Sequence, residues 1–166
     1  MGNVIRILGL DPGLRRTGWG VAQLEGGRLS HLGHGVIAPD ERLPLAERLV
    51  TLFRGVTELI RRFDPHEAAV EETFATANGS STLKLGQARA ASVVAAAAAG
   101  LPVAEYAPKT VKKAVVGVGG ADKKQVAFMV GRLMPAAGAM SADAADALAV
   151  AITHAHARAG RRAPAT

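Results

Sequence analysis

The chain has 166 residues and is 49% hydrophobic, which predicts one domain that buries a sizeable core. It contains no cysteine, so disulfide frameworks and thiolate metal sites are excluded. The net charge of +6 favours a polyanionic partner such as nucleic acid, although a solvated basic surface has the same composition. A basic leader and a run of ~20 strongly apolar residues are not found, so we expect a cytoplasmic protein that does not span a membrane.

The first predicted strand is the aliphatic run over residues 4–10, which ends at the turn Asp11-Pro12-Gly13. A run of this kind suits a central strand that is packed on both faces. Asp11 therefore stands where a buried strand ends. An acid at this place also commonly starts a turn by bonding its own backbone, so Asp11 alone does not decide between a turn and a site.

The rest of the chain alternates between strand-like and helix-like periods, separated by glycine and proline. We expect strands at residues 17–24, 28–37, 68–70 and 101–106, and helices at residues 44–63, 82–99, 108–116, 121–134 and 141–158. This order predicts an α/β fold in which a mixed five-stranded sheet carries helices on both faces. One domain is expected over residues 1–158, followed by a disordered tail at residues 159–166.

Three further acids accompany Asp11. Glu71 follows the short strand over residues 68–70, so a second acid stands at the end of a second buried strand. Asp143 and Asp146 lie in the first two turns of the last helix, on one face, with Cβ atoms roughly 5–6 Å apart. Acids at a helix N-terminus also complement the helix dipole. Two aspartates on an otherwise apolar face nevertheless repel each other unless a cation lies between them.

These acids predict a site for hard divalent cations. Carboxylate oxygens without cysteine or an obligatory histidine suit Mg²⁺ or Mn²⁺ rather than Zn²⁺. A carboxylate cluster can hold two ions about 3.5–4 Å apart, one of which activates a water while the other stabilises the leaving oxygen of a phosphodiester. We therefore expect Mg²⁺, with Mn²⁺ as a substitute and two ions per site, acting on DNA or RNA.

Five ordered segments of the chain resemble the RuvC family of bacterial Holliday-junction resolvases. They are LGLDPGLRRTGWGV, AVEETF, LKLGQARAASVVAA, YAPKTVKKAVVGVGGADKKQV and SADAADALAVAITHAH. The resemblance implies an RNase H-like fold, a homodimer, metal-dependent cutting of four-way DNA junctions in recombination and repair, and a branch-migration motor as a partner. It also implies the metal-binding catalytic carboxylates, which are Asp11, Glu71, Asp143 and Asp146. Some members of the family carry a histidine where this chain has Asp143.

The same resemblance implies residues that contact DNA. Lys112 and Lys123 match family lysines with roles in catalysis or DNA binding. Phe74 matches an aromatic that stacks on a base near the crossover, and an aromatic in a polar loop suits that role; the alternative is that it packs under the loop. Further residues that we expect to contact phosphates are Lys84, Arg89, Lys109, Lys113 and Lys124.

Two predictions concern the helices. His154 lies about 12 Å along the last helix from Asp146, too far to share a metal with it, so we interpret His154 and His156 as surface or partner-facing residues. The alanine-rich helix over residues 82–99 is apolar almost all round. We expect it to serve both the core and the dimer contact, with a purely intramolecular role as the alternative and Ala95 as the position that tests this contact.

Other functions fit the sequence less well. The Gly-Leu-Asp-Pro-Gly motif also resembles the first phosphate loop of actin-like sugar kinases and chaperone ATPases, which need a second comparable domain that these residues do not supply. A related short nuclease family that processes ribosomal RNA shares this motif but not the GQARA and ADAADA segments. A junction-binding dimer that does not cut would leave four carboxylates in an electropositive site without a purpose.

Overall fold

The computed structural model describes residues 2–72 and 77–162. Along the chain the elements are β1 (Ile5–Asp11), β2 (Thr17–Glu25), β3 (Arg28–Ile37), α1 (Leu45–Phe63), β4 (Glu67–Glu71), α2 (Gly79–Ala98), β5 (Val103–Tyr106), α3 (Pro108–Val116), α4 (Lys123–Leu133), the short 3-10 helix η1 (Pro135–Ala137) and α5 (Ala142–Arg162). The strands form one sheet in the order β3-β2-β1-β4-β5. Strands β1 to β3 are an antiparallel meander, while β4 pairs parallel to both β1 and β5. The predicted mixed five-stranded sheet is confirmed.

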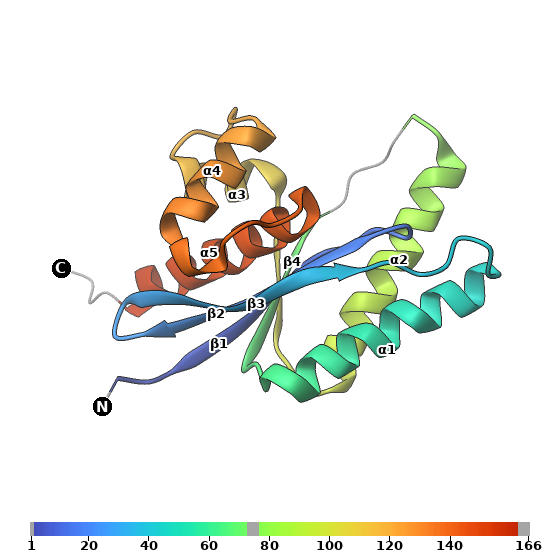
Figure 1. Ribbon diagram of the computed structural model, residues 1–166, viewed down its shortest axis with the longest axis horizontal. Helices are drawn as coiled ribbons and strands as arrows, with labels where there is room; N and C mark the ends of the chain where they lie inside the picture. Colours follow the sequence, from blue (N-terminus) through green and yellow to red (C-terminus); the bar gives the residue numbers. More distant parts are fainter. Residues whose placement is uncertain (1, 73–76, 163–166) are drawn as a thin grey trace.

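Helices cover both faces of this sheet, as predicted: α1 and α2 lie on one face, and α3, α4 and α5 lie on the other (Figure 1). Strand β1 contributes to both cores because its side chains alternate between the faces. Ile7 belongs to the core under α5, whereas Leu8 and Leu10 belong to the core that includes α1. By the same alternation, the side chain of Asp11, the last residue of β1, lies on the face that α5 covers.

Three glycines let α5 lie very close to the sheet. A Cβ atom built on Gly9 would stand 2.1 Å from the carbonyl oxygen of Ala147, and one on Gly20 would stand 2.5 Å from the side chain of Leu148. At Gly18, the corresponding distance to the carbonyl oxygen of Asp143 is 2.0 Å. Any larger residue at these places would push α5 away from β1 and β2, so the glycines determine how near the α5 acids come to Asp11.

Two predicted boundaries are corrected. Helix α5 continues to Arg162, beyond the predicted helix end at residue 158, and the Arg158 side chain bonds Glu67 of β4. Residues 163–166 lie outside the described part of the chain. Helix α2 begins at Gly79 rather than at residue 82, because the Asn78 side chain accepts hydrogen bonds from two backbone N–H groups of the first turn.

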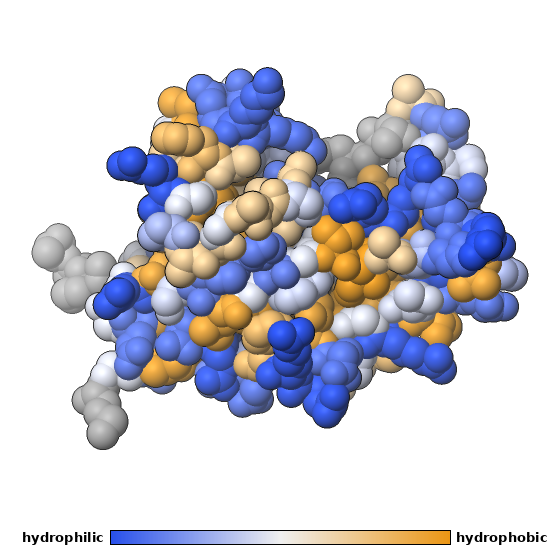
Figure 2. All heavy atoms as spheres, viewed as in Figure 1, coloured by the Kyte–Doolittle hydropathy of each residue, from blue (hydrophilic) through white to orange (hydrophobic). Residues whose placement is uncertain are grey.

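Within residues 2–72 and 77–162, no helix is both long enough and apolar enough to span a membrane. On the face seen in Figure 2, apolar atoms are interspersed among hydrophilic ones rather than joined in a continuous belt.

Candidate active site

Two of the predicted acids leave the same edge of the sheet. Leu10 of β1 and Val70 of β4 are paired in register between parallel strands, and Asp11 and Glu71 directly follow them. Both acids lie on the face that α5 covers, because they share the parity of the residues packed beneath α5. The expected meeting of two strand-end carboxylates is therefore present in the fold.

Helix α5 brings the other two acids to this edge. The Ser141 side chain accepts a hydrogen bond of 3.2 Å from the backbone N–H of Ala144, as expected of an N-cap. The first turns of α5 thus begin over the start of β2, where Gly18 meets the backbone of Asp143. Asp146 follows one turn later on the same helical face, 19% exposed at its side chain.

Asp11, Glu71 and Asp146 line one cavity of about 250 Å³. The sequence places these acids 60 and 75 residues apart, and only the packing of α5 on the sheet brings them together. The other residues that line the cavity come from α3, α4 and α5. They are Pro108, Val111, Lys112, Lys123, Val126 and Ala149. Asp143 stands beside this cavity rather than in its lining.

Burial and mutual repulsion shift the carboxyl groups toward their neutral forms. The pKa of Asp11 is raised to about 7, first by burial and then by the charges of Asp146, Glu71 and Asp143. Burial likewise raises the pKa of Glu71 and of Asp146, with Asp146 adding to the shift of Glu71. A cation within this cluster would relieve the repulsion.

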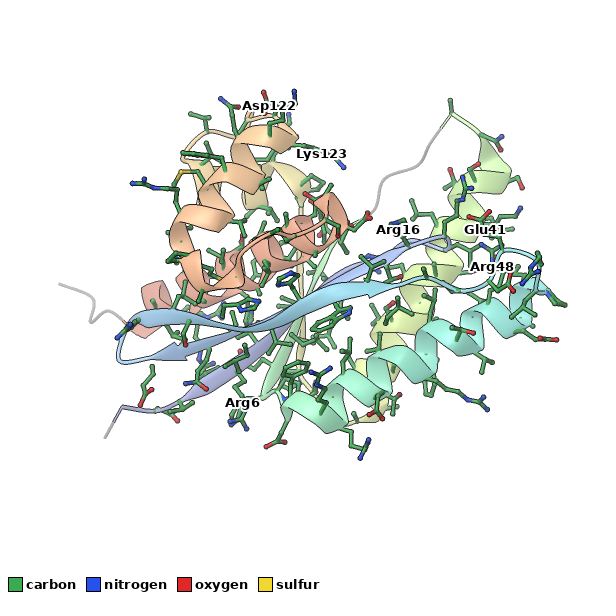
Figure 3. The ribbon with its side chains drawn as sticks, viewed as in Figure 1. Arg6, Arg16, Glu41, Arg48, Asp122 and Lys123 are labelled. Atoms are coloured by element: carbon green, nitrogen blue, oxygen red, sulfur yellow. The ribbon has the colours of Figure 1, made fainter. Side chains whose placement is uncertain are left out.

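Two basic side chains already approach the acids. Lys123 Nζ donates to Asp146 Oδ2 at 3.4 Å, and the charge of Asp146 is the main cause that raises the pKa of Lys123. Arg16 Nε donates to Asp143 Oδ2 at 2.8 Å. Figure 3 labels both residues, and they approach the N-terminal end of α5 from different elements, Lys123 from α4 and Arg16 from the turn after β1.

The donor set fits a hard divalent cation, although its side chains are not yet arranged around one. Within residues 2–72 and 77–162, no group of three His, Cys, Asp or Glu side chains is close enough to hold an ion as it stands. Two of the four carboxylates are paired with basic side chains instead, Asp146 with Lys123 and Asp143 with Arg16. The oxygen-only donors and their partial burial fit Mg²⁺ or Mn²⁺, whose charge would favour the ionised carboxylates.

The predicted DNA-contact residues are divided by the fold. Lys112 and Lys123 line the cavity, whereas Lys84 lines a separate groove with Leu14 and Arg15. The Arg89 guanidinium bonds Glu105 and its side chain is 22% exposed, so its contact with phosphate stays a prediction. Lys109, Lys113 and Lys124 are exposed on α3 and α4, as are Lys123 and Arg132. Phe74 lies outside the described residues.

The interpretation of His154 as a surface residue is wrong. Its side chain is buried between α5 and the sheet, with Nδ1 2.8 Å from the Tyr106 hydroxyl and Nε2 2.5 Å from Glu67 Oε2. Arg158 bonds the other oxygen of Glu67. Helical periodicity placed His154 on the face of the acids, and this face packs against the sheet. His156 is exposed, as predicted.

Sequence reasoning also missed Arg16 as a partner of Asp143. The two arginines after the Asp-Pro-Gly turn were the only sequence signal for this contact. Arg16 and Asp143 are 127 residues apart in the sequence.

Known proteins are similar to this chain in sequence and in architecture. The family model for crossover junction endodeoxyribonuclease RuvC matches residues 7–154. The RuvC of Caulobacter vibrioides is 62% identical over 157 residues, which cover 95% of this chain and 93% of that protein. Thermus thermophilus RuvC, solved in complex with a Holliday junction substrate, is 38% identical with a TM-score of 0.83, and the match covers 94% and 96% of the two chains.

A more distant structure shares the fold. The yeast mitochondrial Holliday junction resolvase Ydc2 is 16% identical, with a TM-score of 0.69 over 93% of this chain and 81% of that one. The expected RNase H-like fold is confirmed by these neighbours. With its sequence matched from β1 to the middle of α5, the chain belongs to the RuvC family of crossover junction endodeoxyribonucleases.

Proposed function

We propose that this protein is a Holliday-junction resolvase, an endodeoxyribonuclease that cuts four-way DNA junctions by paired symmetric nicks during recombination and repair. The observation that carries the proposal is the meeting of Asp11, Glu71 and Asp146 in one cavity that also holds Lys112 and Lys123. Membership of the RuvC family supports the same activity, because nucleases of this family are metal-dependent and a 38% identical relative was solved with a Holliday junction.

We assign the metal to Asp11, Glu71, Asp143 and Asp146, with two Mg²⁺ ions and Mn²⁺ as a substitute. When bound, the ions supply an activated water and stabilise the leaving oxygen, which gives 5′-phosphate and 3′-hydroxyl ends. Asp11 would serve both ions, since it ends the central strand β1 and its carboxyl interacts with those of Glu71, Asp143 and Asp146.

The lysines of the cavity hold and orient the phosphate. Lys112 and Lys123 lower the cost of bringing an anionic strand to a cluster of carboxylates, because both lysines line the same cavity. Val111 and Val126 narrow that cavity with apolar surface and so limit the water around the reacting phosphate. The exposed lysines of α3 and α4 extend this basic surface outward for the arms of the junction, without reading the sequence of their bases.

A homodimer would match the two-fold symmetry of the junction, because it supplies two equivalent active sites. The exposed side of α2 is our choice for the dimer contact, with Leu83 64% and Val94 54% exposed. Ala95 is removed from this contact, since it is 1% exposed and packs in the core of its own chain. A branch-migration motor remains a proposed partner, and the bacterial cytoplasm, where the chromosome lies, is the proposed location.

The proposal is tested by amide substitutions of the acids. Asp11→Asn, Glu71→Gln and Asp146→Asn should each abolish Mg²⁺-dependent nicking of a synthetic four-way junction. They should preserve its binding in EDTA, because removal of negative charge does not weaken the attraction for phosphate. Glu58→Gln is the matched control, since this exposed acid lies on α1, on the opposite face of the sheet, and bonds Arg61 of the same helix. Wild-type cutting by any of the three variants would remove that acid from the site.

A junction-binding protein without nuclease activity is the alternative. It would bind the junction equally well with Mg²⁺ or EDTA and would leave all four strands intact. Strands cut symmetrically in Mg²⁺ and intact in EDTA would exclude this alternative.

A further inference from the structure

Arg16 is held in a rigid turn at the edge of the cavity. The hydroxyl of Thr17 donates to the Gly13 carbonyl at 2.8 Å and accepts from the Gly13 N–H at 3.2 Å, so the loop that carries Arg16 is closed on itself. Thr17 is completely buried, which holds the end of this loop at the start of β2. The guanidinium of Arg16 therefore starts from a fixed backbone position rather than from a mobile loop.

The partner of Arg16 is equally constrained. Asp143 belongs to the first turn of α5, and its backbone lies directly on Gly18, where no side chain could be accommodated. Arg16 and Asp143 thus meet at 2.8 Å between two fixed pieces of backbone, with side chains 54% and 34% exposed. The pair requires no rearrangement of the fold to form or to open.

The neighbouring arginine points elsewhere. Arg15 donates from Nε and Nη2 to the two carboxylate oxygens of Glu41, at 2.6 and 3.0 Å, and is 77% exposed. Two consecutive arginines are therefore directed to two different acids, one outside the site and one within it. This difference separates a specific contact of Arg16 from the general effect of positive charge near the cavity.

The charge of Asp143 belongs to the acidic cluster although its side chain does not line the cavity. It contributes to the raised pKa values of both Asp11 and Asp146. A hydrogen bond from Arg16 occupies a lone pair on Oδ2 that a metal ion would need, and a guanidinium next to that oxygen repels a divalent cation. Arg16 and a metal ion cannot both use this oxygen fully.

We propose that Arg16 is an internal competitor of the divalent metal for Asp143, and that this competition sets the metal concentration at which the site fills. The inference rests on the proposed function, because it takes Asp143 as a metal ligand. Arg16 acts through Asp143 and is therefore a positioning residue rather than a catalytic one. Its guanidinium neutralises Asp143 before metal enters and gives way when the ion binds.

Calorimetric titration of the full chain with Mn²⁺, without DNA, tests this role. Arg16→Gln should bind Mn²⁺ about two- to fivefold more tightly than the wild type, the range expected for loss of a half-exposed ion pair. Arg15→Gln removes the same charge one residue away and should leave the affinity unchanged, because Arg15 is engaged by Glu41. Arg16→Lys keeps the charge and should stay within about twofold of the wild type. Thermal unfolding of each variant verifies that it is folded.

A double-mutant cycle locates the effect. In an Asp143→Asn background the gain from Arg16→Gln should disappear, because the shared acceptor is gone. An unchanged or weaker affinity in Arg16→Gln would overturn the proposal, as would an equal gain in Arg15→Gln or a gain that persists without Asp143. Asp11→Asn distinguishes failure of this inference from failure of the proposed function. If this variant bound Mn²⁺ as tightly as the wild type, the proposed metal site would itself be wrong.

Discussion

A Cβ atom on Gly9 of β1 would stand 2.1 Å from the carbonyl oxygen of Ala147 in α5, a distance that no real side-chain carbon adopts. At Gly9, Gly18 and Gly20, helix α5 therefore lies directly on the backbone of the sheet, because no side chain separates them there. Asp146 precedes Ala147, and Asp11 lies two residues beyond Gly9 on the same face of β1. The close approach of α5 is thus what brings the helical acids to the strand-end acids.

Substitution of Gly9 should damage stability and activity together. Gly9→Ala must displace α5, and such overpacking typically costs 1–3 kcal/mol of unfolding free energy. Junction cutting should be lost even where the protein is still folded, because the α5 acids move away from Asp11. Gly86→Ala is the control: nothing lies within 4 Å of a Cβ there, and alanine in a helix should stabilise by about 0.5–1 kcal/mol. Urea denaturation and cutting assays measure both effects, and wild-type stability of Gly9→Ala would contradict this account.

Stability without metal should decrease as pH rises. The pKa of Asp11 is about 7 in the folded protein and 3.8 in its ordinary state, so the folded protein holds a proton that the unfolded chain releases. This contribution is fully present below pH 4 and is lost as pH rises through 7. At about 1.4 kcal/mol per pKa unit, the difference in unfolding free energy between wild type and Asp11→Asn should change by up to about 4 kcal/mol. Denaturation in EDTA at pH 4 to 8 measures it, and parallel pH profiles would contradict the buried-carboxyl explanation.

The buried histidine should matter for stability and its exposed neighbour should not. His154→Ala removes the bond partner of Glu67 Oε2 and of the Tyr106 hydroxyl, and an unsatisfied buried polar group costs about 1–3 kcal/mol. His156→Ala removes the same side chain from the surface and should stay within about 0.5 kcal/mol of the wild type. Urea denaturation compares the two variants, and equal unfolding free energies would mean that the His154 contacts contribute nothing.

The dimer contact can be tested on two adjacent residues of α2. Val94→Glu adds a charge to the exposed side and should yield folded monomers if the dimer forms there. Ala95→Glu buries the same charge in the core and should unfold the chain rather than report on assembly. Size-exclusion chromatography with light scattering gives the mass, and circular dichroism gives the folding state. A folded dimer from Val94→Glu would place the contact on another surface.

Phe74 carries a prediction from the sequence alone. Stacking on a base at the crossover would be worth roughly 1–3 kcal/mol, and the base must first be unstacked from its neighbours. Phe74→Ala should therefore slow cutting of a fully paired junction far more than cutting of a junction with unpaired bases at its centre. Single-turnover rates on the two substrates measure this ratio. Equal losses would indicate that Phe74 packs the loop instead.

Local sequence was sufficient for the secondary structure and for the chemical class of the site. The period of apolar residues and the turn signals predicted both ends of β3 and of α3. They also placed Asp11 and Glu71 at the ends of buried strands, because an apolar run that stops at an acid is a local pattern. The start of α4 was set too early by two residues, since Asp122 forms a capping box with Gln125 whose side-chain bonds override periodicity.

The partners of polar side chains were decided only by the tertiary structure. Arg16 meets Asp143, Arg89 meets Glu105, and His154 meets Glu67 and Tyr106, all across segments distant in sequence. Charge and periodicity cannot predict such pairs, because each depends on which strand lies beneath which helix and on how closely the backbones approach. The sequence by itself determined that four carboxylates would stand at element ends. The glycines that seat α5 on β1 and β2 determine, through the folded structure alone, that three of them share one cavity while Arg16 holds the fourth at its edge.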